Sequence, residues 1–313
     1  MNNNDAEKYI ENHIGDTIQN LTLFPKFFLL ETVNFCNANC IMCGIDFKKK
    51  TKQTISDALF KKVINEISDY KDHVEKVMLY LDGEPLLDKC LVERIQYTKK
   101  KGIKIVNIAS NASKLDQETS KNLISAGLDE IYITIDSTKK EVYEKIRRGL
   151  NFDTVKENVL NFINIRNQLN SKLKIRIQMI KQPLNFEEAE IFQNYWFEIL
   201  GLNDQVVIQK SHNWASKVEV MKYGDESDVN KIPCIALWGT FVMHVDGEVP
   251  LCCMDSKTNI KIGDINKNSI KDIWKGRKIN AIRKKHLENE RADIPLCNGC
   301  TLWRISKKEM QTK

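Results

Sequence analysis

The sequence predicts an α/β fold with a parallel sheet, followed by a smaller C-terminal unit. Between residue 26 and about residue 210, short apolar runs alternate with helical patterns, as they do in βαβ units. Beyond residue 233, an Asp-Gly pair separates two β-prone runs, which predicts a β-hairpin. A length of 313 residues allows one large domain or two smaller ones.

These changes of pattern divide the chain into five expected parts. They are an N-terminal arm at 1–25, a core at 26–210, a polar connector at 211–232, a cysteine-bearing unit at 233–305 and a tail at 306–313. The core is expected to contain six strands, near 26–33, 76–81, 103–109, 130–135, 173–180 and 205–209.

Helices are expected between these strands. After the first strand, Ser56 is a candidate N-cap for a helix whose apolar face contains Leu59, Val63, Ile64 and Ile67. After the third strand, Gly127 is a candidate helix stop. In the C-terminal unit, a helix with Ile270, Ile273 and Trp274 is expected to follow the hairpin.

Three cysteines lie close together directly after the first expected strand. Cys36, Cys40 and Cys43 have the spacing C-x₃-C-x₂-C, which is a ligand set and not a disulfide framework. Three thiolates leave one position of a metal site open, as in a centre that binds and activates a ligand. A structural zinc site would need a fourth ligand nearby, and Gly44, Ile45 and Asp46 follow instead.

This motif resembles the radical SAM superfamily. The resemblance implies a partial (β/α)₆ TIM-type barrel in which the three cysteines hold a [4Fe–4S] cluster. The fourth iron of that cluster is chelated by S-adenosylmethionine, and the family draws its electron from a flavodoxin- or ferredoxin-type donor. Met42 departs from the family pattern, because an aromatic residue is usual before the third cysteine.

Residues after later strands also resemble the cofactor-binding positions of the family. Asp82-Gly83-Glu84-Pro85 is similar to the family's Gly-Gly-Glu motif, which engages the amino group of the cofactor, although Asp82 replaces the first glycine. Ordinary turns also contain such residues. The resemblance implies that Gly83 and Glu84 bind the cofactor.

Two further pairs follow the third and fourth expected strands. Ser110 with Asn111, and Asp136 with Ser137, resemble positions that contact the ribose and the carboxylate of the cofactor. Each pair alone is weak evidence for a site, because these residue types are also the commonest in turns and caps. Arg147 and Gln178 are weaker candidates.

A second set of cysteines lies in the C-terminal unit. Cys234, Cys252, Cys297 and Cys300 can fill all four positions of a second [4Fe–4S] cluster. Their arrangement resembles the shortened SPASM, or twitch, domain of radical SAM enzymes. A zinc site is the alternative for this unit alone, because four cysteines with one C-x₂-C pair also suit zinc.

Two of the nine cysteines remain outside these sets. Cys90 is expected to be a small buried hydrophobic residue. If Cys252 faces the second cluster from a strand, alternation would point Cys253 to the other face, toward the barrel mouth. Cys253 would then be a catalytic hydrogen donor to a substrate radical. The alternative is that Cys253 is the ligand and Cys252 is not.

The resemblance implies cleavage of S-adenosylmethionine to a 5′-deoxyadenosyl radical. The expected reaction is epimerisation or oxidation of a carbinol carbon in a sugar-type small molecule. The first alternative is a peptide-modifying SPASM enzyme, although 25 residues before the first strand are too few for a leader-binding domain. The second is a non-catalytic zinc-binding module.

Composition argues against other classes of function. The net charge of +6 is small for a chain with 48 basic residues, and no apolar run approaches the length of a membrane span. Lysine runs at 48–50 and 99–101 are typical of solvated surfaces, so no nucleic-acid partner is expected. We expect a cytoplasmic protein that does not bind a membrane, because no export signal precedes the nine cysteines.

Overall fold

The computed structural model of the chain describes residues 3–47, 51–215, 229–301 and 310–312, and it contains an eight-stranded sheet with the order β10-β6-β5-β4-β3-β2-β1-β7. The strands are β1 (Phe27–Leu30), β2 (Lys76–Met78), β3 (Ile105–Ser110), β4 (Glu130–Thr134), β5 (Lys174–Lys181), β6 (Gln205–Lys210), β7 (Thr240–Met243) and β10 (Met310–Thr312). Strands β1 to β6 are parallel neighbours in chain order, which confirms the predicted α/β core.

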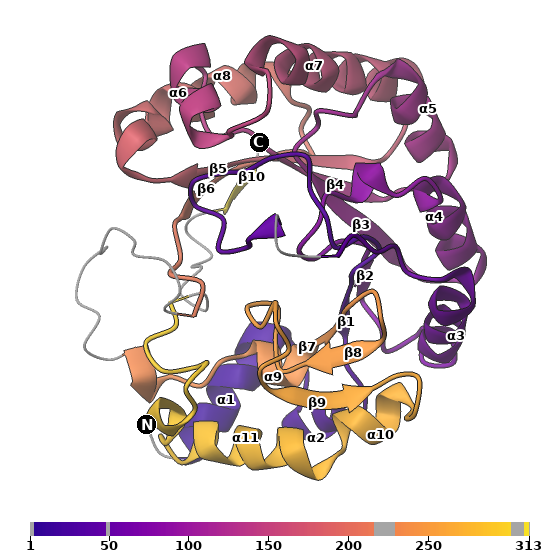
Figure 1. Cartoon of the computed structure of the whole chain (residues 1–313), viewed down its shortest axis with the longest axis vertical. Coiled ribbons are helices and arrows are strands. Elements are labelled where there is room, and N and C mark those ends of the chain that lie inside the picture. The colour runs from indigo at the N-terminus through magenta and orange to yellow at the C-terminus, as the bar shows by residue number, and fades with distance from the viewer. Residues whose placement is uncertain (1–2, 48–50, 216–228, 302–309, 313) are drawn as a thin grey trace.

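Helices lie on the outer side of the curved sheet, as in a partial barrel (Figure 1). They are α3 (Asp57–Ser68), α4 (Leu91–Lys100), α5 (Gln117–Ser125), α6 (Lys140–Ile146), α7 (Phe152–Gln168) and α8 (Ala189–Ile199). The predicted cap is confirmed, since the Ser56 hydroxyl accepts a hydrogen bond from the Leu59 amide at 3.2 Å. Gly127 follows α5 with a φ of +85°, a conformation that favours glycine, and ends that helix.

The C-terminal unit contains the expected antiparallel hairpin, but its strands are not the two runs on either side of Asp246-Gly247. The turn is present, because the Gly247 amide donates to the His244 carbonyl at 3.0 Å. However, β7 pairs in parallel with β1, while β8 (Glu248–Pro250) pairs with β9 (Lys261–Asp264) in a separate two-stranded sheet. The edge of β1 offers β7 unpaired backbone groups, and these decide the pairing.

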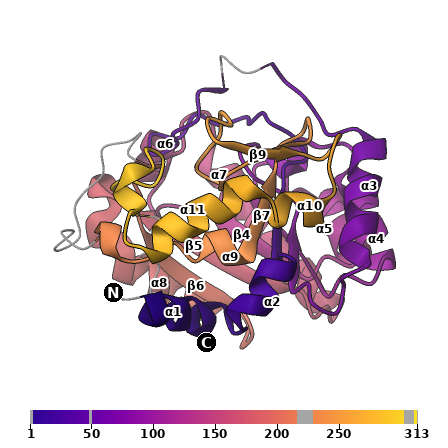
Figure 2. The same ribbon diagram turned by 90° about the horizontal axis from the view of Figure 1, so that it is seen from below.

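The N-terminal arm packs on the C-terminal unit. Its helices α1 (Asn3–Ile14) and α2 (Ile18–Leu23) contact α9 (Ala236–Gly239), α10 (Ile270–Trp274) and α11 (Arg277–Leu287), as Figure 2 shows from below. The indole N–H of Trp274 donates to the Leu21 carbonyl at 2.8 Å. The N-terminal helices α1 and α2 therefore form part of the packing that stabilises the C-terminal unit.

Parts of three predicted features lie outside the described residues: 48–50 of one lysine run, 216–228 of the connector, and 302–309 and 313 near the C-terminus. Among the helices that are described, none combines the length and the apolar character needed to span a bilayer.

Candidate functional site

A cavity of about 300 Å³ opens at the carboxyl ends of the barrel strands, where parallel α/β folds place their ligands. All three cysteines of the first motif line it. Gly83, Glu84, Ser110 and Asn111 line it as well, together with Met42 and the weaker candidates Arg147 and Gln178. The structure thus brings together residues from five separate segments of the sequence.

The first three cysteines form one electrostatic group. Burial, together with the charge of the Cys40 thiolate, raises the pKa of Cys36 and of Cys43 to about 11. Arg147 counters this charge, because its Nη1 lies 3.6 Å from the Cys40 sulfur. Three soft thiolates beside a buried guanidinium fit an anionic iron–sulfur cluster with one open iron.

Gly83 is required by a close approach of two loops. A Cβ atom at this position would lie 2.2 Å from the Val33 carbonyl oxygen and 2.7 Å from that of Phe35. The Glu84 amide donates to the same Phe35 carbonyl at 3.0 Å. The loop after β2 is therefore held against the loop that carries the cysteines.

The Glu84 carboxylate ties β2 to β3. It accepts hydrogen bonds from the Ser110 hydroxyl at 2.7 Å and from the amides of Asn111 and Leu86 at 2.8 and 3.1 Å. Burial raises the pKa of Glu84, and these three donors oppose that rise. These three hydrogen bonds within the protein fix the position of the cavity wall.

Asp136 and Ser137 are not among the residues that line the cavity. Asp136 is fully buried and accepts hydrogen bonds from the Arg147 side chain and from the Ile180 amide. The Ser137 hydroxyl donates to Glu188 at 2.7 Å. Asp136 thus orients Arg147 toward Cys40, so Asp136 acts on the site through Arg147.

The second cysteine set lies in a separate apolar cluster. Cys234, Cys252, Cys253, Cys297 and Cys300 all belong to it. Strand β8 ends at Pro250, so alternation along a strand does not separate Cys252 from Cys253 as expected, and both follow the strand in a turn. Burial raises the pKa of both thiols, and the charge of Cys234 contributes to the rise.

Charged groups from two parts of the structure affect the pKa of Cys253. Burial raises the pKa of Cys253 to about 12, and the charges of Cys234, Cys300 and Asp82 add to the effect. Asp82 lines the cavity and also raises the pKa of Cys43. Cys253 therefore belongs to the second cysteine cluster and also feels the charge of Asp82.

Cys90 is exposed, which corrects the expectation that it is buried. It precedes the first residue of α4 at the N-cap position, where the chain turns into the helix at the surface.

The cavity has further lining residues. His212 and Trp214 reach it from the connector, and Tyr80, which sequence reasoning missed, lines it too. Burial lowers the pKa of His212 to about 4, so its imidazole is neutral. Glu31 and His244 follow β1 and β7 directly, and position at a strand end is the signal that could have marked them.

Two family models match the chain. The model for the radical SAM superfamily matches residues 30–173, and the SPASM model, an iron–sulfur cluster-binding domain, matches residues 234–301. The second match favours an iron–sulfur cluster over zinc in the C-terminal unit.

Individual proteins are similar over different extents. GTP 3′,8-cyclase of Lactiplantibacillus plantarum is 31% identical over 172 residues, which cover 53% of this chain and 49% of the relative. The matched part thus spans about half the length of that relative. The structure of BtrN in complex with AdoMet and 2-DOIA has a TM-score of 0.62 at 19% identity, covering 89% of this chain and 93% of BtrN.

The structure of Streptococcus suis SuiB bound to precursor peptide SuiA has a TM-score of 0.66 at 14% identity, covering 83% of this chain and 67% of SuiB. These structures share the fold. The two family models together match most of the chain and show that it is a member of the radical SAM superfamily with a SPASM domain, which implies S-adenosylmethionine and two [4Fe–4S] clusters as cofactors.

Proposed function

We propose that this enzyme removes a hydrogen atom from a carbinol carbon of a sugar-type small molecule and either epimerises or oxidises that carbon. Cys36, Cys40 and Cys43 would hold the first cluster, and Cys234, Cys297, Cys300 and Cys252 the second. When bound, the first cluster and S-adenosylmethionine supply a 5′-deoxyadenosyl radical, with an electron from a flavodoxin- or ferredoxin-type protein.

The protein's own contribution to cofactor binding would come from the cavity wall. The main chain at Gly83 and Glu84 and the polar groups of Ser110 and Asn111 lie beside the cysteines. Arg147 would balance the charge of the thiolates, since its guanidinium contacts Cys40 and is held by Asp136.

The chemistry of the cavity favours a polar substrate. Asn39, Gln178 and Gln209 line it and offer amide donors and acceptors that suit hydroxyl groups. BtrN, whose structure was solved in complex with AdoMet and 2-DOIA, shares the fold over 93% of its length.

The observation that carries the proposal is the cavity at the strand ends, which brings the three cysteines of the first motif together with polar groups that suit a hydroxyl-bearing substrate. Cys253 is the candidate hydrogen donor, because it is the fifth thiol of the second cysteine cluster. A buried thiol with a pKa near 12 keeps its S–H bond at neutral pH. Such a thiol would deliver a hydrogen atom to a substrate carbon radical and complete an epimerisation. The thiyl radical left on its sulfur would return to the thiol by taking one electron from the flavodoxin- or ferredoxin-type donor and one proton from solvent. If Cys253 instead holds the second cluster, oxidation is the outcome that the site supports.

Iron and sulfide content separates these two outcomes. After anaerobic reconstitution, we expect about eight irons per chain in the wild type. Cys252→Ala should lose about half of this iron, whereas Cys253→Ala should keep it. Cys90→Ala is the matched control, because Cys90 is exposed and belongs to neither set. Loss of iron in Cys253→Ala would assign it as a ligand and end the hydrogen-donor role.

Turnover of candidate sugar alcohols in D₂O then tests the reaction. An epimerase should place one solvent deuterium on the inverted carbon, and Cys253→Ala should still form 5′-deoxyadenosine but no epimer. An oxidase should form a ketone without deuterium at that carbon. If no small alcohol of this class supports 5′-deoxyadenosine formation above the uncoupled rate, the substrate class is wrong.

A peptide substrate is the second candidate. Its support is the shared fold with SuiB, which was solved with precursor peptide SuiA. Formation of 5′-deoxyadenosine that depends on a peptide, and not on a sugar alcohol, would establish it.

A further inference from the structure

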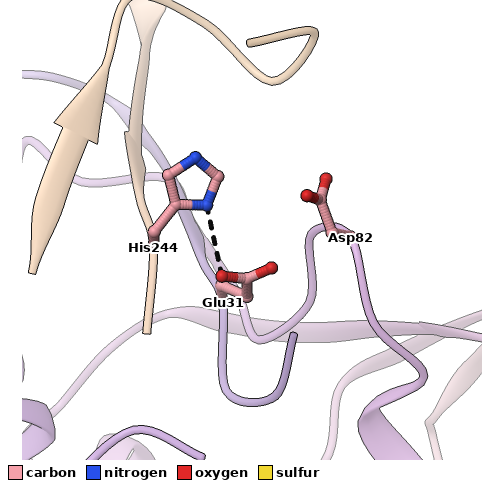
Figure 3. A group of neighbouring side chains, drawn as sticks. All are labelled: Glu31, Asp82 and His244. Carbon is pink, nitrogen blue, oxygen red and sulfur yellow. Dashed lines mark hydrogen bonds and ion pairs between the residues drawn. The ribbon is translucent and has the colours of Figure 1, made fainter. Parts of the chain in front are cut away.

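Three potential metal ligands meet at the carboxyl ends of three neighbouring strands. Glu31 directly follows β1, His244 directly follows β7, and Asp82 lies in the loop after β2. One ligand atom from each residue lies within 4.8 Å of the others, and Glu31 stands between His244 and Asp82 (Figure 3). Glu31 and His244 are 1% and 6% exposed.

The hydrogen bonds of His244 leave a position for a cation. Its Nε2 lies 3.3 Å from the Asp255 carbonyl oxygen, which can only accept, so Nε2 carries a hydrogen. In the neutral imidazole, Nδ1 then presents a lone pair to a Glu31 carboxylate oxygen 3.2 Å away. Two lone pairs cannot face each other at this distance unless a proton or a metal ion lies between them.

The geometry of His244 is also that of a metal ligand. Metal-binding histidines usually donate their second ring N–H to a carbonyl or carboxylate, which fixes the tautomer and the orientation of the ring. The Asp255 carbonyl is placed to accept this hydrogen bond.

Glu31 provides the second and independent observation. Its Oε2 accepts from the Val245 amide at 3.1 Å and faces His244. Its Oε1 is buried and has no hydrogen-bond partner. A carboxylate oxygen without a partner is costly when buried. Figure 3 shows this second oxygen on the side of Asp82, toward the middle of the group.

The charge of the group favours a dication over a proton. Two carboxylates and a neutral imidazole carry a formal charge of −2. One proton between His244 and Glu31 would leave −1 and would not satisfy Oε1 of Glu31. A divalent ion neutralises the group and supplies a partner for that oxygen.

We propose that Glu31, Asp82 and His244 bind one divalent transition-metal ion, in addition to the two iron–sulfur clusters. One imidazole and two carboxylates suit Mn²⁺, Fe²⁺ or Zn²⁺, and three protein ligands leave at least one position open. Asp82 lines the cavity, so the proposed metal site borders it.

The role of the ion in catalysis rests on the proposed function. A hydroxyl oxygen of the substrate would occupy the open position, and coordination would orient the alcohol and lower the pKa of its hydroxyl. This role also accounts for the departure at position 82, because glycine, usual there in the family motif, offers no ligand.

Manganese binding to the anaerobic, cluster-loaded protein tests the site without turnover. Mn²⁺ avoids thiolates, and its free aqueous ion gives an EPR signal that disappears on binding. We expect one Mn²⁺ per chain in the wild type and at least tenfold weaker binding in Glu31→Gln and His244→Ala. Glu75→Gln is the control, because it makes the same change before β2, at the opposite end of that strand.

Iron and sulfide counts and circular dichroism identify variants that fail to fold or to load clusters, and Asp82→Asn provides a third variant. Wild-type protein that leaves Mn²⁺ free at about 1 mM would overturn the proposal, as would unchanged affinity in Glu31→Gln. A proton shared by His244 and Glu31 would then be the occupant. Manganese binding without turnover of any sugar alcohol would keep the site and reject only the proposed reaction.

Discussion

Replacement of Glu84 by glutamine distinguishes a carboxylate that holds the cavity wall from one that binds the cofactor directly. The Glu84 carboxylate is buried and accepts three hydrogen bonds, from Ser110, Asn111 and Leu86. In Glu84→Gln, the amide oxygen can retain the bond from Asn111, and the amide nitrogen can donate to the Ser110 hydroxyl. The Leu86 amide then loses its acceptor.

The expected loss of stability follows from this count. One buried donor without a partner and the loss of charge assistance cost about 2 kcal/mol together, which lowers Tm by about 3–5 °C. Glu84→Ala leaves all three donors unpaired, at about 1–3 kcal/mol each, which approaches the whole stability of a typical domain.

Thermal unfolding under anaerobic conditions measures this loss, and equilibrium binding measures the affinity for S-adenosylmethionine. Ser110→Ala completes a double-mutant cycle with Glu84→Gln, with an expected coupling of about 1 kcal/mol. Unchanged Tm with a tenfold loss of affinity in Glu84→Gln would refute the reasoning, because the carboxylate would then contact the cofactor itself.

Two further predictions concern the loops around the cavity. Gly83→Ala should lower the affinity for S-adenosylmethionine at least tenfold while iron content is kept, since its Cβ would lie 2.2 Å from the Val33 carbonyl oxygen; unchanged affinity would show that the loops can separate freely. In cluster-free protein, the thiols of Cys36 and Cys43 have a pKa of about 11, so about one in a thousand is ionised at pH 8. Their alkylation, followed by mass spectrometry, should therefore rise about tenfold per pH unit toward pH 11, and exposed Cys90 should react first.

The parallel core could be predicted because its signals are local. Each strand is a short apolar run, and α3 begins at a serine whose hydroxyl caps it. The first cysteine motif is also local, since eight consecutive residues contain all three thiols. Its neighbours at the cavity followed from one general rule, that loops after parallel strands meet at one edge of the sheet.

The partners of side chains at strand ends could not be predicted in the same way. Asp136 and Ser137 follow β4 as expected. However, Asp136 forms an ion pair with Arg147, and the Ser137 hydroxyl donates a hydrogen bond to Glu188, so both side chains are bound by other elements of the protein. The pairing of β7 with β1 joins segments about 210 residues apart, and no local pattern specifies it. The pairing brings His244 beside Glu31 and Asp82, so the sequence alone could not predict this group of residues either.

The parallel pairing of β7 with β1 also limits how this enzyme could be recombined with its relatives. A chimaera cut in the connector would leave β7 with the C-terminal half and expose the edge of β1 in the other half. Such an edge is a template for aggregation. The C-terminal unit is therefore not an interchangeable module. An exchange that preserves folding must transfer β7, its partner strand β1 and the ligand positions at their ends together.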